Sequence, residues 1–178
     1  VLVSVLVNPT QFNDVKDFDL YPRTLDVDAK KAENAGAHAV FAPLAEDLYG
    51  GRPEAQSVSW GNVTDAFEGA LRKGHFDGVI RVVDLLFQAV RPKAAVFGAK
   101  DLQQVAVVKR MARERHPEVN VVVGELIRDA DGLALSSRNV RLNEEGVQLA
   151  LTLSRTLFEV KRKVGACSTG EDLTPVVD

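Results

Sequence analysis

Short apolar runs of strand length alternate with longer segments of helical period along most of this chain of 178 residues. The expected strands are Val1–Val7, Ala39–Ala42, Ala94–Phe97 and Val119–Val123, and the expected helices are Thr24–Ala35, Phe76–Val90 and Leu102–Arg115. A parallel pair of strands needs a long crossover connection, usually a helix, so this alternation is typical of a parallel sheet. The sequence therefore predicts an α/β fold, a parallel sheet with flanking helices.

Residues that favour helix ends stand at the ends of these segments. Thr24 and Asp101 are suitable N-caps, and Gly36 is a suitable C-cap. Apolar residues such as Val79 and Val83 repeat at helical spacing and indicate a face that packs on the core.

The character of the sequence changes after Val123. A polar stretch leads to a serine-rich loop and then to a long helix, expected from about Asn143 to Val164. We place a domain boundary near Ile127, with residues 1–126 in one domain and residues 127–178 beginning a smaller C-terminal domain. Ser168–Asp178 is expected to start a further helix. There is no initiator Met, and we expect the chain to be truncated at both ends.

The formal net charge of −3 comes from nearly balanced acids and bases, with no basic block and no apolar run long enough to cross a bilayer. Nucleic acid and membranes are therefore not expected partners. Cys167 is the only cysteine, which excludes an internal disulfide, and the three histidines are too far apart for zinc spacing. We expect a reducing, cytoplasmic location and predict no metal-ligating residues.

Ligands of open parallel sheets bind at the carboxyl ends of the strands, so the loops that follow strands are the candidates for a site. The first such loop, from Asn8 to Asn13, is a run of amides around Pro9. Amides offer both donors and acceptors, which suits a substrate with hydroxyl groups and a carboxylate. A turn with solvated amides is the alternative interpretation.

The second loop runs from Phe97 to Asp101 and leads into a helix. Gly98 permits close approach of the backbone, the helix start presents free amide groups, and Lys100 adds a mobile positive charge. These features predict a phosphate site, although neither the Walker pattern nor Gly-x-Gly-x-x-Gly occurs in the chain. A tight turn with Asp101 as N-cap and Lys100 in solvent is the alternative.

The third loop contains Ser136, Ser137, Arg138 and Asn139 after an Asp-Gly turn. Two hydroxyls and a guanidinium can hold phosphate oxygens and the charge that develops on a leaving pyrophosphate. A serine-capped surface loop after a hairpin is the alternative, because Asp-Gly is also a strong turn signal.

In order and spacing, five segments of the chain resemble the pantothenate synthetase family. They are Val7-Asn8-Pro9-Thr10-Gln11-Phe12, Tyr21-Pro22-Arg23-Thr24, Gly74-His75-Phe76-Asp77-Gly78, Phe97-Gly98-Ala99-Lys100-Asp101-Leu102-Gln103-Gln104 and Asp131-Gly132-Leu133-Ala134-Leu135-Ser136-Ser137-Arg138-Asn139. The resemblance extends from Val1 to at least Leu153. It implies membership of the HIGH-type nucleotidyltransferases, which share a Rossmann-like fold with class I aminoacyl-tRNA synthetases, and the serine-rich loop resembles their KMSKS element.

The resemblance implies a carbon–nitrogen ligase that uses ATP with Mg²⁺. The carboxylate of pantoate attacks the α-phosphate of ATP, which gives pantoyl adenylate and pyrophosphate. The amine of β-alanine then displaces AMP and gives pantothenate. The family is homodimeric, so a homodimer is also implied.

Carried over position by position, the resemblance implies three groups of site residues. Gln11 and Gln104 would bind pantoate, Gln11 would also contact β-alanine, and Asn8 would belong to the same substrate site. ATP would be bound by Gly98, Ala99, Lys100, Asp101, Ile127, Leu135, Ser136, Ser137 and Arg138. Catalysis would depend on Lys100, Ser136, Ser137 and Arg138, because adenylyl transfer needs positioning and charge neutralisation more than a covalent nucleophile.

Three residues depart from the family pattern. Ala99 stands where glutamate is expected, and Arg81 and Leu85 stand where threonine and lysine are expected. The family's segment with two histidines is not found in the chain, and His75 belongs to a different segment. The resemblance therefore implies that the isolated chain is inactive.

Two other functions remain open. The first is another nucleotidyltransferase of the same type with a different small acceptor; a phosphate-bearing acceptor would call for additional Arg or Lys near Gln11 and Gln104. The second is a noncatalytic nucleotide-binding fragment.

Overall fold

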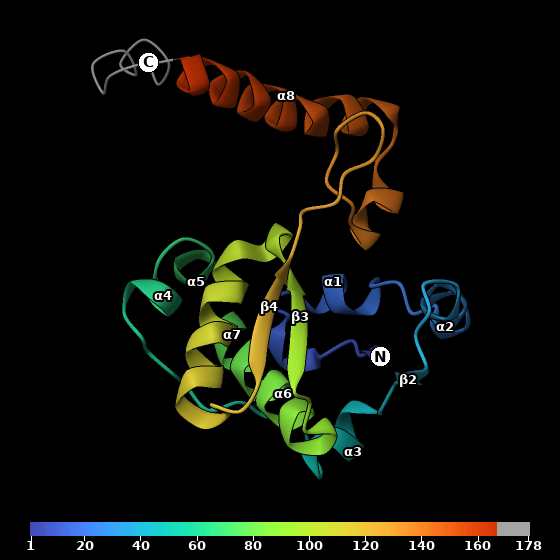
Figure 1. Cartoon of the computed structure of the whole chain (residues 1–178), viewed down its shortest axis with the longest axis vertical. Coiled ribbons are helices and arrows are strands. Elements are labelled where there is room, and N and C mark those ends of the chain that lie inside the picture. The colour runs from blue at the N-terminus through green and yellow to red at the C-terminus, as the bar shows by residue number, and fades with distance from the viewer. Residues whose placement is uncertain (167–178) are drawn as a thin grey trace. The chain divides into compact units, whose positions relative to one another are not determined.

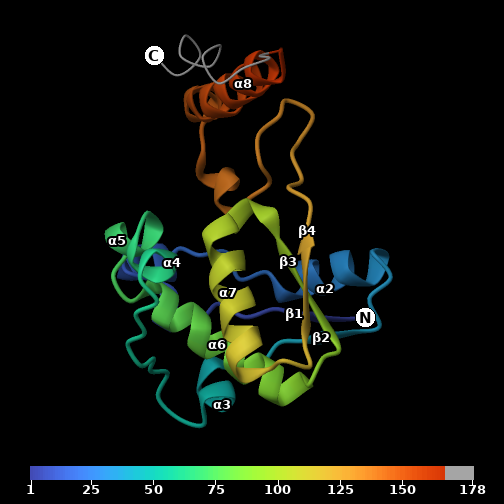
Figure 2. The same ribbon diagram turned by 60° about the vertical axis from the view of Figure 1, so that its left-hand side comes forward.

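The computed structural model describes residues 1–166, and Figures 1 and 2 show the path of the chain. By its internal contacts the chain divides into two compact units, with the division between Glu125 and Leu126. The helix expected at Ser168–Asp178 lies outside the described residues. No helix within residues 1–166 combines the length and the hydropathy needed to span a bilayer.

The first unit contains four short strands in two separate parallel pairs. β1 (Leu2–Ser4) pairs with β2 (Ala39–Phe41), and β3 (Ala94–Gly98) pairs with β4 (Asn120–Gly124). The predicted parallel direction is confirmed. The predicted single sheet differs from the structure, because among the described residues no ladder joins one pair to the other. The pattern along a chain identifies strands, but it carries no information about which strand edges meet.

Two helices form the core of this unit with the second strand pair. α6 (His75–Val90) and α7 (Leu102–Arg115) cover one face of β3 and β4 (Figure 2). Apolar residues at helical spacing on both helices make one buried cluster: Phe76, Val79, Ile80, Val82, Val83, Phe87, Val107, Val108, Met111 and Ala112, joined by Val119. Because side chains alternate along a strand, Val96 points to the other face of the sheet and is 70% exposed.

The helix ends confirm part of the predicted capping. α2 (Leu25–Asn34) ends in a Schellman motif, in which Gly36 has φ of 85° and the amide of Ala37 donates to the carbonyl of Ala32 at 2.9 Å. Thr24 and Asp101 do stand at the N-cap positions of α2 and α7. Neither side chain caps its helix. The Thr24 hydroxyl donates to Asp28 instead, and the Asp101 carboxylate pairs with Lys100.

Several very short elements were not predicted. They are η1 (Pro9–Gln11), α1 (Val15–Asp19), α3 (Ala45–Tyr49), α4 (Asn62–Asp65), α5 (Glu68–Leu71) and η2 (Ala99–Asp101). Each spans about one turn, which is too short for a periodic apolar pattern to appear. Between α4 and α5 the chain passes through Phe67, whose φ of 48° is rare for a residue with a side chain.

The described part of the second unit, residues 126–166, contains a small hairpin and two helices. An antiparallel bridge between Arg128 and Ala134 closes over a turn in which Gly132 has φ of 95°, so the predicted Asp-Gly turn is confirmed. η3 (Ser137–Arg141) follows, and then α8 (Glu144–Ala166), the predicted long helix. Asn143 caps α8, since its Oδ1 accepts from the amide of Gly146 at 2.8 Å.

Candidate active site

The first predicted loop folds into the single turn η1 directly after β1. Asn8 is its N-cap, and the ring of Pro9 occupies the first helical position, where no amide donor is needed. The Oδ1 atom of Asn8 accepts from the backbone amide of Thr10 at 3.4 Å and from its hydroxyl at 3.1 Å. Gln11 therefore stands at the end of a turn that the Asn8 side chain organises.

Asn8 itself is buried, with 2% of its surface exposed. Its amide nitrogen donates to the carbonyl of Gly78 at 3.1 Å and to Oε1 of Gln11 at 3.2 Å. Both amide hydrogens thus have partners inside the protein. Asn8 was predicted to lie in the substrate site; in the structure its side chain lies beneath Gln11 and orients the amide of Gln11.

Tyr49, at the end of α3, supports Asn8 from the other side. Its hydroxyl donates to Oδ1 of Asn8 at 2.8 Å and lies 2.9 Å from the hydroxyl of Thr10. Burial raises the pKa of the Tyr49 phenol, against the opposing effects of these hydrogen bonds and of the Arg81 charge. The phenol therefore keeps the proton that it donates.

The start of α6 packs directly on the η1 turn. A Cβ atom at Gly78 would lie 2.3 Å from the carbonyl oxygen of Thr10 and 2.7 Å from the amide nitrogen of Gln11. These distances are well inside van der Waals contact, so only glycine permits this approach of the two backbones.

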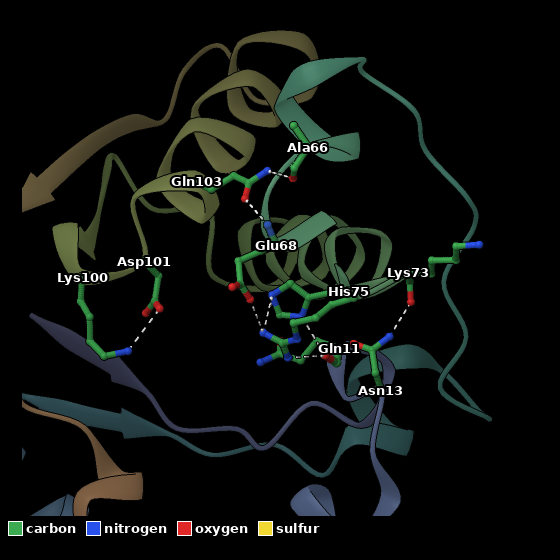
Figure 3. Close-up of polar contacts among 10 residues, drawn as sticks. Gln11, Asn13, Ala66, Glu68, Lys73, His75, Lys100, Asp101 and Gln103 are labelled. Carbon is green, nitrogen blue, oxygen red and sulfur yellow. Dashed lines mark hydrogen bonds and ion pairs between the residues drawn. The ribbon is translucent and has the colours of Figure 1, made fainter. Parts of the chain in front are cut away.

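The backbone carbonyl of Gln11 is held by two side chains from the segment before and within α6. Nδ1 of His75 lies 2.8 Å from this oxygen, and Nη2 of Arg72 donates to it over an N–O distance of 3.3 Å (Figure 3). Arg72 also pairs with Glu68 at 3.3 Å. The backbone amide of Glu68 donates to Oε1 of Gln103, two residues after the second loop, at 3.1 Å. Burial lowers the pKa of His75, and the charge of Asp101 in the second loop opposes this shift. Polar contacts therefore join the first loop to the start of α7.

The second loop has the features expected of a phosphate site. A Cβ atom at Gly98 would meet no heavy atom within 4 Å, so the backbone there is open to a ligand. Gly98 has an ordinary φ of −71°, which shows that the backbone conformation alone does not require glycine. Ala99 to Asp101 form η2, and the amide groups at the start of α7 follow. Among the residues that the structure describes, Lys100 pairs with the exposed Asp101 alone, at 3.3 Å.

The two neighbouring glutamines of α7 differ in their surroundings. Gln103 donates to the carbonyls of Val63 and Ala66 at 3.2 and 2.8 Å and accepts from the amide of Glu68 at 3.1 Å (Figure 3). Gln104 is half-buried, and its side chain makes no hydrogen bond within residues 1–166. Only Gln104 therefore has its amide available for a ligand.

The third loop belongs to the second unit, where the hairpin brings the remaining predicted ATP residues together. The amide of Leu135 donates to the carbonyl of Ile127 at 3.0 Å, and both side chains are exposed. The hydroxyl of Ser136 accepts from the amide of Arg138 at 3.3 Å and caps η3. This cap is the feature expected from the alternative interpretation, a serine-capped loop after a hairpin, and Ser137 and Arg138 lie in the turn that it starts.

No group of three His, Cys, Asp or Glu side chains within residues 1–166 is arranged to hold a metal ion.

The sequence did not reveal the residues that hold Asn8 and Gln11 in place. It assigned no role to Tyr49, Arg72, His75 or Gly78. The segment from Gly74 to Gly78 was visible as part of the family pattern. The contacts of these residues with the η1 turn join positions that are 39 to 70 residues apart, and such contacts leave no pattern in the local sequence.

Comparisons with known proteins give a consistent result. A family model described as pantoate-beta-alanine ligase matches residues 1–176. A pantothenate synthetase of Bacteroides fragilis is 45% identical over 177 residues, which cover 99% of this chain and 62% of the relative. One from Streptomyces avermitilis is 49% identical over 159 residues, covering 89% of this chain and 47% of the relative.

Solved structures of pantothenate synthetases are also similar to this chain. The pantothenate synthetase of Thermus thermophilus has a TM-score of 0.90 and 40% identity, covering 99% of this chain and 64% of the other. The pantoate-beta-alanine ligase of Francisella tularensis, solved with Beta-gamma ATP and Beta-alanine, has a TM-score of 0.79 and 30% identity, covering 98% of this chain and 65% of the other. The chain thus spans about 62% of the Bacteroides relative's length.

Proposed function

Because the chain belongs to the pantoate-beta-alanine ligase family, we propose that its complete gene product joins pantoate to β-alanine at the expense of ATP. Pantoate is first activated as pantoyl adenylate with release of pyrophosphate, and the amine of β-alanine then displaces AMP. We assign the activity to the complete gene product because the chain spans only part of the length of its relatives.

The observation that carries this proposal is the proximity of the first two loops at the carboxyl ends of β1 and β3. Arg72 donates to the Gln11 carbonyl and pairs with Glu68, and the backbone amide of Glu68 donates to Gln103, two residues after Asp101. Ligands of parallel sheets bind at such an edge. A carboxylate held near Gln11 would therefore stand beside a nucleotide held by the Lys100 loop.

Each predicted residue has a role that its surroundings support. Lys100, exposed and paired only at the surface, neutralises phosphate charge, and Gly98 and Ala99 let the nucleotide approach the backbone. Asp101 reaches the ribose. Gln104, with its amide available, binds pantoate together with Gln11. The chemistry then needs alignment and charge stabilisation rather than a covalent nucleophile.

The second unit supplies the remaining contacts to ATP in this proposal. Ser136, Ser137 and Arg138 bind phosphate oxygens and stabilise the leaving pyrophosphate, while Ile127 and Leu135 contact the nucleotide with their exposed side chains. Mg²⁺ arrives with ATP and adds charge neutralisation. A Rossmann-like domain of residues 1–126, a smaller domain that begins with residues 127–178, a cytoplasmic location and a homodimer belong to the same proposal.

The proposal is tested by following AMP formation in the complete gene product with pantoate and β-alanine added separately and together. We expect AMP only when both are present, and pyrophosphate exchange into ATP with pantoate alone. Exchange that depends on a different small acid, and not on pantoate, would instead favour another nucleotidyltransferase of the same type. The chain of residues 1–178, assayed in parallel, tests whether these residues bind nucleotide without turnover.

A further inference from the structure

We infer that His75 and Arg72 are positioning residues for Gln11, and that His75 acts as the neutral tautomer with its hydrogen on Nδ1. This inference rests on the proposed role of Gln11 in binding pantoate. It concerns how the Gln11 amide is aimed, and neither His75 nor Arg72 is proposed to touch the substrate.

The tautomer follows from the two neighbours of the imidazole ring. The Gln11 carbonyl oxygen can only accept, so Nδ1 of His75, at 2.8 Å, must carry a hydrogen. Nε2 of the same ring faces Nη1 of Arg72 at 3.5 Å, and a guanidinium can only donate. Nε2 is therefore the acceptor, and the ring is neutral.

The electrostatic environment agrees with this geometry. Burial lowers the pKa of His75, and the positive charge of Arg72 lowers it further, whereas the bond to the Gln11 carbonyl and the charges of Glu68 and Asp101 raise it. A second proton would sit on Nε2 and face the Arg72 guanidinium. Arg72, which also bonds to Gln11, thus disfavours a hydrogen on Nε2, both in the charged ring and in the other neutral tautomer.

Gln11 is held at both ends by this arrangement. His75 and Arg72 fix its carbonyl, Asn8 fixes its side-chain oxygen at 3.2 Å, and Gly78 brings the α6 backbone against the turn. Rotation of the peptide at Gln11 would break the bonds at the carbonyl and move the side chain. A substrate-binding group that is misplaced by about 1 Å can lower the rate by a factor of about 100, so the alignment of the Gln11 amide bears on function.

The first experiment measures nuclear magnetic resonance signals of the complete gene product without substrates. Long-range proton–nitrogen spectra should show a neutral His75 with the hydrogen on Nδ1. His75→Phe should shift the side-chain amide signal of Gln11, while His75→Asn, whose amide can donate from nearly the same place as Nδ1, should largely restore it. A hydrogen on Nε2, or a Gln11 signal unchanged in His75→Phe, would overturn the inference.

The second experiment separates positioning from general stability. His116 has the same exposed fraction as His75, 8%, and bonds to Asp84 in the second half of α6, away from Gln11, so His116→Phe is the matched control. We expect His75→Phe to raise the KM for pantoate about tenfold, with His75→Asn closer to the wild type and His116→Phe unchanged in KM. Equal effects of His75→Phe and His116→Phe on KM would reduce His75 to a structural residue.

Gln11→Ala, measured beside these variants, keeps the two hypotheses apart. If Gln11→Ala raises the KM for pantoate and His75→Phe does not, the proposed function stands and the positioning inference fails. If Gln11→Ala itself leaves the pantoate dependence unchanged, the assignment of Gln11 in the proposed function is wrong.

Discussion

The hydroxyl of Tyr49 donates to Oδ1 of Asn8 at 2.8 Å, across 41 positions of sequence. The contact joins the end of α3 to the turn that presents Gln11. The orientation of a residue proposed to bind substrate therefore depends on a tyrosine that lies outside every motif recognised in the sequence.

Tyr49→Phe should lower the free energy of unfolding by about 1 kcal/mol, the net value of a typical hydrogen bond. It should also raise the KM for pantoate, because Asn8 loses one of the donors that fix its amide. Denaturant unfolding and steady-state kinetics measure the two effects. A double-mutant cycle with Asn8→Ala should show coupling; additivity of the two changes within about 0.5 kcal/mol would contradict the proposed linkage.

Gly78→Ala should destabilise the first unit. Alanine favours a helix over glycine by about 1 kcal/mol, but the new methyl group would lie 2.3 Å from the Thr10 carbonyl oxygen. Overpacking of this kind costs about 1 to 3 kcal/mol, so the net effect should be a loss.

Gly146→Ala in α8 is the control for this change. Its methyl group would meet only side-chain atoms, the nearest being Oδ1 of Asn143 at 3.1 Å, and a shift of this atom by a few tenths of an ångström relieves the contact while the N-cap bond is kept. Calorimetric melting curves should show a lower Tm for Gly78→Ala and little change for Gly146→Ala. Indistinguishable curves would mean that the turn is not packed on α6 as described.

Lys100→Ala should reduce turnover by about 10 to 1,000-fold, because it removes a charge aimed at phosphate. The fold should be unaffected, since the Lys100 side chain is 40% exposed and pairs only with exposed Asp101. Lys30→Ala, which breaks another surface pair at 2.6 Å, is the matched control. Turnover of Lys100→Ala equal to that of Lys30→Ala would remove Lys100 from the site.

Gln104→Ala should change the kinetics without changing the stability, whereas Gln103→Ala should lower the stability. Gln104→Ala should raise the KM for pantoate more than the KM for ATP and leave the melting curve unchanged, because its amide has no partner within residues 1–166. Gln103→Ala should lower stability by about 1 to 3 kcal/mol, because three hydrogen bonds to the turn between α4 and α5 are lost. Kinetics with each substrate varied, together with unfolding curves, distinguish the two outcomes.

The stability that neutral His75 confers should decline in mildly acidic solution. Its folded pKa lies below the ordinary value of 6.5, so below about that pH the unfolded state binds the proton more readily than the folded state. The contribution of His75 to the free energy of unfolding is therefore fully present above pH 6.5 and falls as the pH drops from 6.5 through the folded pKa. The difference in unfolding free energy between wild type and His75→Asn should shrink over this range; a constant difference would show that His75 does not titrate on unfolding.

Much of the first unit could be predicted because its long elements carry periodic signals. Leu102–Arg115 was predicted with the bounds that the structure has, and the Schellman end of α2 was signalled by Gly36. The turn at Asp131 and Gly132 was equally visible. In each case a local preference and the tertiary fold agree, which is what makes a local pattern informative.

The remainder depended on contacts between distant segments. Asp101 was predicted to cap α7, but its carboxylate pairs with the neighbouring Lys100 and makes no hydrogen bond to the helix amides. Nothing local separates Gln103 from Gln104. Their difference arises because the α4–α5 turn comes within reach of the first and not of the second.

The separation of the strands into two pairs has a consequence for folding. β1 and β2 are joined through η1, α1 and α2, and β3 and β4 through η2 and α7, so each ladder closes between strands that are consecutive along the chain. Closing a short loop costs less chain entropy than closing a long one, and local pairings form early. The two ladders can therefore assemble independently, and hydrogen exchange should report two distinct opening energies within the first unit.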